Sequence, residues 1–147
     1  MGYTMDGSII GIVGSEEIKF TTSGREIAIQ KIIELLSMPG IEAVVSGGCH
    51  LGGIDLWAAA IGKELGIYVI EFLPMKRTWN GGYKERNIKI AEASDIVHCI
   101  TVNKLPDNYT GMRFEGCYHC HSKDHVKSGG CWTMKRAKLG QLHIIEN

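Results

Sequence analysis

The sequence predicts an α/β protein of the Rossmann-like type, in which helices cover both faces of an open parallel sheet of about five strands. Short apolar runs rich in Val and Ile alternate with longer segments whose apolar residues recur at helical spacing. Glycine-rich turns follow several of the apolar runs. The length of 147 residues is typical of one domain, so we expect residues 1–147 to form a single Rossmann-like domain.

In the first half of the chain, the run SIIGIVGS (residues 8–15) predicts a buried strand with a tight loop after it. Apolar residues at helical spacing from Ile29 to Leu36 predict an amphipathic helix that stops before Pro39. The run EAVVSGG (42–48) is the second strand. An apolar stripe from Ile54 to Leu65 marks the next helix, which Gly66 closes.

In the second half, YVIEFLP (68–74) is the third strand, and a helix with Tyr83, Asn87, Ile90 and Ala91 on one face follows it. DIVHCITV (95–102) is the fourth strand. CWTMKRAKLG (131–140) predicts a short helix and QLHIIEN (141–147) a last strand. Residues 103–130 show no clear period and hold a Cys/His cluster, so we interpret them as a metal-binding loop inserted before the last helix.

The composition of the chain argues against nucleic acid and membranes as partners. The formal net charge is zero, which does not favour nucleic acid as the partner, and no apolar run is long enough to span a bilayer. The N-terminal MGYTMDG lacks the basic and apolar regions of a secretory signal, so we expect a cytoplasmic protein without a membrane partner. Its five cysteines are then thiols or metal ligands rather than disulfides.

Three glycine-rich loops are expected beyond the carboxyl ends of the strands, where open parallel sheets bind ligands. Two of them share the tetrapeptide Ser-Gly-Gly-Cys and lead into helices, whose N-termini favour anions. The loops predict a site for a small phosphate-bearing nucleotide; the alternative is that they are only tight turns. The predicted ligand-binding residues are Gly14, Ser15, Ser46, Gly47, Gly48, Gly53, Ser128, Gly129 and Gly130.

Three polar residues at helix starts join this prediction. Asp55 is either a helix-terminal carboxylate or an acceptor for a ligand sugar hydroxyl or base edge. Arg86 is suited to a bidentate phosphate contact, and Asn87 to capping the helix or contacting the ligand.

The series Cys117-x2-Cys120-x4-His125-x5-Cys131 predicts a zinc site. Four protein ligands make the zinc structural, and through Cys131 it orders the glycine loop at the start of the last helix. His119 and His121 are alternative fourth ligands. An open site with three ligands and a zinc-bound water, or a redox-active Cys pair, is the other interpretation.

The segments VVSGGCHLGGIDLWAAAIGKELG, GGYKERN, IAEASDIVHCI and SGGCWTMKRAKLG, in that order, resemble the SLOG superfamily. This Rossmann-like group contains the DNA-processing protein A and the cytokinin-activating "lonely guy" hydrolases. The chain is most similar to the small YpsA-like subgroup of bacteria and phages. The resemblance covers nearly the whole chain except residues 103–124, and it implies a nucleotide-type ligand.

The resemblance leaves the reaction open. The lonely-guy hydrolases carry a Glu after a Pro-Gly-Gly-x-Gly-Thr loop, and neither Ser-Gly-Gly loop here has a carboxylate at that position. We therefore rank nucleotide binding first and hydrolysis of a nucleotide N-glycosidic bond second. A nucleic-acid-binding accessory protein is third, and we expect a homo-oligomer.

Overall fold

The computed structural model describes residues 8–147 and confirms the α/β prediction. Five parallel strands form one sheet in the order β3-β2-β1-β4-β5. The strands are β1 (Ser8–Gly14), β2 (Ile41–Ser46), β3 (Tyr68–Glu71), β4 (Ile96–Val102) and β5 (Gly140–Ile145). Residues 1–7, on which the prediction of no secretory signal depends, lie outside the described residues.

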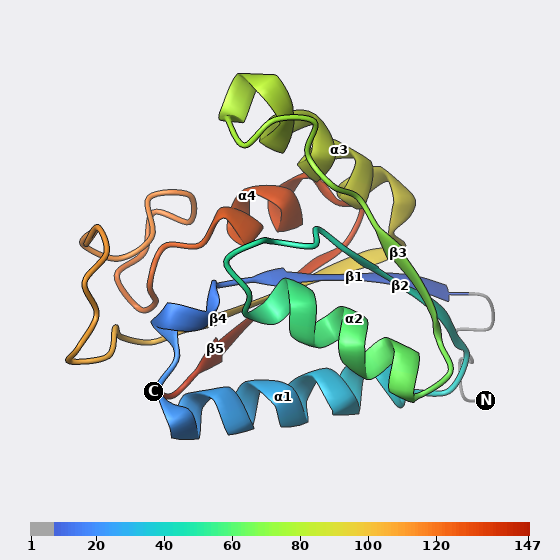
Figure 1. The fold of residues 1–147 in the computed structure, drawn as a ribbon, viewed down its shortest axis with the longest axis horizontal. Helices are drawn as coiled ribbons and strands as arrows, with labels where there is room; N and C mark the ends of the chain where they lie inside the picture. Colours follow the sequence, from blue (N-terminus) through green and yellow to red (C-terminus); the bar gives the residue numbers. More distant parts are fainter. Residues whose placement is uncertain (1–7) are drawn as a thin grey trace.

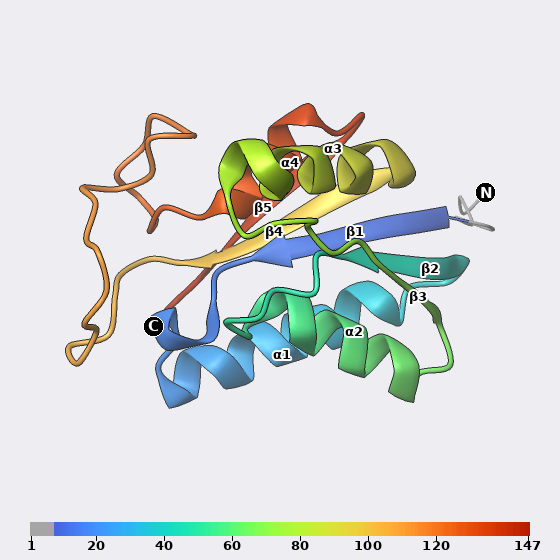
Figure 2. The same cartoon turned by 45° about the horizontal axis from the view of Figure 1, so that its top comes forward.

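Helices cover both faces of the sheet (Figures 1 and 2). The helices α1 (Thr22–Leu36) and α2 (Ile54–Glu64) pack on one face, and α3 (Lys84–Ala93) and α4 (Gly129–Arg136) on the other. A short 3-10 turn, η1 (Glu17–Lys19), follows β1, and a π turn, η2 (Trp79–Tyr83), leads directly into α3. This places the two Ser-Gly-Gly-Cys loops before helices on opposite faces of the sheet.

Side-chain alternation along the central strands divides the core in two. Ile10 and Ile12 of β1 lie in the cluster formed with α1 and α2, whereas Val13 packs with Ile90 of α3 on the other face. β4 divides in the same way, and its Cys99 lies in the cluster on the α3 and α4 side. The near-continuous apolar runs in the sequence therefore reflect strands that are buried on both faces.

The strand order creates a switch point between β1 and β4. From β1 the chain moves outward to β2 and β3, then crosses back so that β4 and β5 extend the sheet on the other side of β1. Loops after β1 and β4 consequently diverge, which opens a crevice at the carboxyl edge of the sheet.

The segment between β4 and α4 carries no helix or strand, apart from an antiparallel bridge between Cys117 and Ser122. It projects beyond the carboxyl ends of the strands and then returns to the sheet (Figure 1). On its return the Val126 N–H donates to the Val102 carbonyl at 2.8 Å, and Thr101 Oγ1 donates to the Val126 carbonyl at 2.8 Å. These bonds bring the loop back beside β4 just before α4 begins.

Candidate ligand cleft and metal centre

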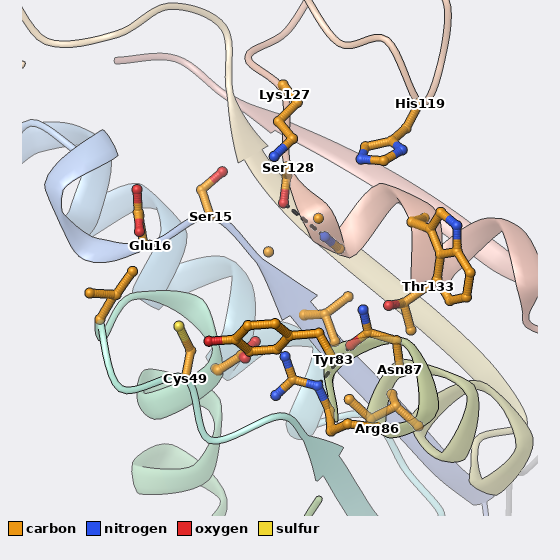
Figure 3. A pocket seen from close by; sticks show the side chains of 18 of the residues that line it. Ser15, Glu16, Cys49, Tyr83, Arg86, Asn87, His119, Lys127, Ser128 and Thr133 are labelled. Atoms are coloured by element: carbon orange, nitrogen blue, oxygen red, sulfur yellow. Dashed lines mark hydrogen bonds between the residues drawn. The ribbon is translucent and has the colours of Figure 1, made fainter. Parts of the chain in front are cut away.

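A cavity of about 750 Å³ lies at the switch point. Its walls come from the end of β1, the loop before α2, the turn η2 with α3, and the late loop with α4. In Figure 3, Lys127 and Ser128 lie across the cavity from Tyr83 and Arg86. The volume falls within the range usual for small-molecule sites.

The end of β1 is fixed against β4 at one side of this cleft. The Ser15 N–H donates to the Ile100 carbonyl at 3.0 Å, and Ser15 Oγ lies 2.9 Å from Thr101 Oγ1. A Cβ at Gly14 would lie only 2.0 Å from the Ile100 carbonyl oxygen, so the close approach of the strands requires glycine there. The cleft therefore has a rigid wall along the strand ends.

The N-terminus of α4 faces the cleft. Ser128 caps the helix, and its Oγ accepts from the Gly130 N–H at 3.1 Å. A Cβ at Gly129 would meet no atom within 4 Å, whereas one at Gly130 would lie 3.0 Å from Cys99 Sγ and from the Gly14 nitrogen. Gly129 thus borders open space where the helix dipole is positive, and Gly130 packs onto the sheet.

Three cationic side chains line the cleft: Lys19, Arg86 and Lys127. Lys19 Nζ donates to the Lys127 carbonyl at 3.1 Å. Burial lowers the pKa of Lys19 from its usual value and the Lys127 ammonium lowers it further, although Glu16 opposes both. An anion bound beside these two ammonium groups would relieve their repulsion.

Arg86 is buried and joins α3 to the early glycine loop. Its guanidinium donates to the Gly47 carbonyl at 2.5 Å and to Asn87 Oδ1 at 2.7 Å, and it lies 5.3 Å from the Tyr83 ring centroid. These contacts fix the guanidinium at the cleft wall before any ligand arrives.

Asp55 is a buried carboxyl group in the cleft lining. Its side chain is 7% exposed, and Oδ1 has no hydrogen-bond partner in the described part of the chain. Burial raises the pKa of Asp55 to about 6, although the nearby Arg86 guanidinium opposes this effect. A carboxyl group with such a pKa can accept a hydrogen bond or exchange a proton near neutral pH.

Aromatic rings lie at the end of the cleft formed by η2 and α4. The rings of Trp79 and Trp132 meet edge to face at a centroid distance of 4.8 Å. The Arg136 guanidinium lies 3.5 Å from the centroid of the Trp132 ring. From the late loop, Tyr118 and His119 bring two further rings to the lining.

The late loop brings together the four predicted metal ligands. The ligand atoms of Cys117, Cys120, His125 and Cys131 all lie within 4.8 Å of one another, and His125 Nε2 lies 3.8 Å from Cys131 Sγ. His125 Nδ1 hydrogen-bonds with Asp124 Oδ1, which leaves Nε2 turned toward the thiols. A carboxylate on the second ring nitrogen is typical of metal-binding histidines. This Cys3His group can hold a metal ion.

The thiols differ in how readily they ionise. Although burial acts to raise it, backbone N–H groups, those of Ser128 and Cys120 among them, bring the pKa of Cys117 down to about 7. Burial and the neighbouring thiols raise the pKa of Cys120 to about 12. The Cys99 thiol, 3.8 Å away, and burial also raise the pKa of Cys131. Crowded thiols of this kind ionise together only when a cation offsets their charge.

The structure gathers eight of the twelve predicted ligand-binding residues at the cleft: Gly14, Ser15, Asp55, Arg86, Asn87, Ser128, Gly129 and Gly130. The other four do not line it. Ser46 donates to the Asp55 carbonyl, and Gly47 sits behind Arg86. Gly48 has a φ of +57° and faces Leu73, and Gly53 packs against the Ser15 carbonyl with a φ of +82°. These four residues shape the loop that carries Asp55.

Several lining residues were missed in the sequence. Glu16 and Lys19 enter through η1, a 3-10 turn where only a tight loop was expected. Lys127 directly precedes the late glycine loop, and this adjacency is the signal that could have identified it. The sequence predicts Tyr83 on the same face of the third helix as Asn87, and the structure places both in the cleft lining.

In comparisons with known proteins, no family model, no curated protein and no solved structure matches this chain. The resemblance to the SLOG superfamily stays a prediction. Among the described residues, no helix is both long and apolar enough to cross a membrane.

Proposed function

We propose that the protein binds a phosphate-bearing nucleotide or nucleotide derivative in this cleft. The observation that carries the proposal is the arrangement at the switch point. There, a cavity of about 750 Å³ is bordered by the N-terminus of α4 and by Lys19, Arg86 and Lys127. Cationic side chains and a helix N-terminus together favour a phosphate. The SLOG resemblance points to the same ligand class.

The aromatic residues support a nucleotide over a simple phosphate. Trp79 and Trp132 are in the lining, and both are partly exposed. Because the Arg136 guanidinium covers one face of Trp132, the 42%-exposed Trp79 ring is the better platform for a base. Asp55 Oδ1, which has no partner within the described residues, offers an acceptor for a sugar hydroxyl or an exocyclic amino group. The cleft thus offers separate partners for phosphate, base and sugar.

We further propose that the metal is zinc and that its role is structural. Three thiolates and one imidazole are a common ligand set for tetrahedral zinc, and four protein ligands leave no open coordination position. When bound, zinc would supply the positive charge that lets the crowded thiols ionise together. We also propose a reducing, cytoplasmic location, in which the five cysteines would be thiols or metal ligands.

A second candidate function is hydrolysis of a nucleotide N-glycosidic bond. It rests on Asp55, a buried carboxyl group in the cleft lining whose pKa burial raises to about 6. Such a group is suited to general acid–base catalysis. Release of free base from nucleoside monophosphates at about 1 per second or faster would favour this second function. We expect much slower release, since neither glycine loop carries the hydrolase Glu.

The test of nucleotide binding is calorimetric titration with nucleoside monophosphates, ADP-ribose and the corresponding nucleosides. We expect Lys127→Met to weaken binding of the phosphorylated ligands about tenfold and to leave nucleoside binding unchanged. Lys123→Met is the matched control, because Lys123 lies on the same loop but pairs with Glu115 at 2.8 Å outside the cleft. If the parent protein binds none of these ligands at millimolar concentration, the proposal fails.

A further inference from the structure

The metal cluster and the cleft share the same stretches of backbone. Tyr118 and His119 lie between the ligands Cys117 and Cys120, and Lys127 and Ser128 lie between His125 and Cys131. These four residues line the cleft. Figure 3 shows His119, Lys127 and Ser128 on the same side of the cavity. One wall of the cleft is therefore made of the turns that connect successive metal ligands.

This wall has few other attachments. Between β4 and α4 the described chain has no helix or strand, and its one β-bridge within the loop is that between Cys117 and Ser122. Hydrogen bonds tie the loop to the rest of the fold at Val126, which bonds to Val102 and Thr101, and at the Lys127 carbonyl, which accepts from Lys19. Cys117 of the loop and Cys131 of α4 are both buried in the core cluster on the α3 and α4 side. His125, 1% exposed, is the largest fully buried side chain of the loop. The ligand side chains are thus the main anchors of the wall.

We propose that metal binding and ligand binding are coupled in this protein: the metal assembles one wall of the cleft, and a ligand in the cleft tightens the metal site. The proposal rests on the proposed function and extends it to regulation. Without the metal, the turn carrying His119 loses its main anchor and the turn carrying Lys127 keeps only the bonds of Val126 and Lys127 to the sheet and η1. A ligand must then order these turns as it binds, which weakens its affinity. By linkage, the ligand raises metal affinity by the same factor.

The experiment compares the full chain as zinc-loaded protein, after removal of zinc with a chelator, and after zinc is restored. Hydrogen exchange is followed by mass spectrometry, and affinity for AMP by calorimetry. We expect amides of residues 117–128 to lose protection on zinc removal while β1 and β4 keep theirs, and AMP affinity to fall at least about tenfold. Restored zinc should reverse both changes, and saturating AMP should raise zinc affinity by the same factor.

The outcomes separate this proposal from the function it rests on. Unchanged protection and unchanged AMP affinity after zinc removal would overturn the coupling and leave nucleotide binding intact. Loss of protection throughout the sheet would also overturn it, since the metal would then act on the whole fold. If zinc-loaded protein binds no AMP, nucleotide binding fails for this ligand, and the exchange of residues 117–128 alone decides whether the metal builds the wall.

Discussion

The tetrapeptide Ser-Gly-Gly-Cys occurs twice, and the two copies do different work. In the early copy, Ser46 to Cys49, the serine donates to the Asp55 carbonyl and the loop continues to Gly53 before α2 begins at Ile54. In the late copy, Ser128 to Cys131, the serine caps α4, which begins at Gly129. The late glycines face the cleft or the sheet, and the late cysteine joins the metal cluster.

The difference shows that distance to the helix start decides the role of a glycine loop. Where the helix begins immediately, its N-terminus lies at the loop and can receive an anion. Where several residues separate the glycines from the helix, the glycines only allow the loop to turn. In the early loop, the Gly47 carbonyl already accepts a hydrogen bond from Arg86. Four substitutions or matched pairs test this comparison.

The cysteines of the two copies give the largest expected contrast. Cys131→Ser removes one of the four metal ligands, so we expect metal affinity to fall by more than about 100-fold. Loss of a residue that only hydrogen-bonds to a ligand typically costs about 10–100-fold, and loss of a ligand itself should cost more. Cys49→Ser lies outside the cluster and should keep one metal per chain. Elemental analysis and chelator competition measure both. Equal metal content in the two variants would contradict the assigned cluster.

The helix that follows the early loop carries a buried carboxyl group, Asp55, in its first turn, and the helix after the late loop has no acidic residue there. Asp55→Asn should reveal this charge in the pH dependence of stability. Because burial raises its pKa to about 6, the folded state binds the proton more tightly than the unfolded state. Asp55 therefore lowers the free energy of unfolding progressively as pH rises from about 4 to 6, by up to roughly 3 kcal/mol. The asparagine variant should lack this loss, so its advantage should be largest at pH 7–8 and small at pH 4.

A second buried group, His98, also makes stability depend on pH, and its contribution has to be separated from that of Asp55. Burial and the neighbouring His143, whose Nε2 is 2.9 Å from His98 Nδ1, lower the pKa of His98 to about 4. That histidine makes stability rise between about pH 4 and 6.5, which is the opposite slope. Both proteins carry His98, so the difference in free energy of unfolding between variant and parent isolates Asp55. A difference that does not change with pH would show that the carboxyl has an ordinary pKa.

The glycines give a smaller contrast with opposite signatures. Gly48→Ala places a side chain at a φ of +57°, which costs about 1–2 kcal/mol of stability, and its nearest neighbour is the end of the exposed Leu73 side chain. Gly129→Ala should change stability by no more than about 0.5 kcal/mol, because nothing lies within 4 Å of its Cβ. It should instead weaken AMP binding about tenfold, since the methyl group occupies the cleft where we place the phosphate.

Chemical denaturation and calorimetry on both glycine variants decide the matter. Correctly folded Gly48→Ala protein should bind AMP within about twofold of the parent, because Gly48 does not line the cleft and no ligand contact is lost. If Gly129→Ala binds AMP as well as the parent does, the late loop is a turn and nothing more.

The strands and the metal ligands could be predicted from the sequence because their signals are local. Each strand contains a short run rich in apolar residues, and the four ligands lie within 15 residues, from Cys117 to Cys131. The sequence alone does not decide which histidine is the fourth ligand. In the structure, the buried Nε2 of His125 lies beside the thiols, whereas His119 lines the cleft. The cations Lys19 and Lys127 lie 108 positions apart, and only the folding of η1 against the late loop brings them together.

Asp124 offers the smallest and most specific test of the late copy. It is exposed and is not a ligand, yet it hydrogen-bonds with Nδ1 of His125 and so keeps Nε2 toward the thiols. Asp124→Asn preserves the shape of the side chain but removes its charge, so we expect metal affinity to fall about tenfold, with one metal still bound at saturation. Asp107→Asn, another exposed aspartate of the same segment, is the control. Equal metal affinities in the two variants would mean that packing alone orients His125, and the carboxylate would have no part in the metal centre.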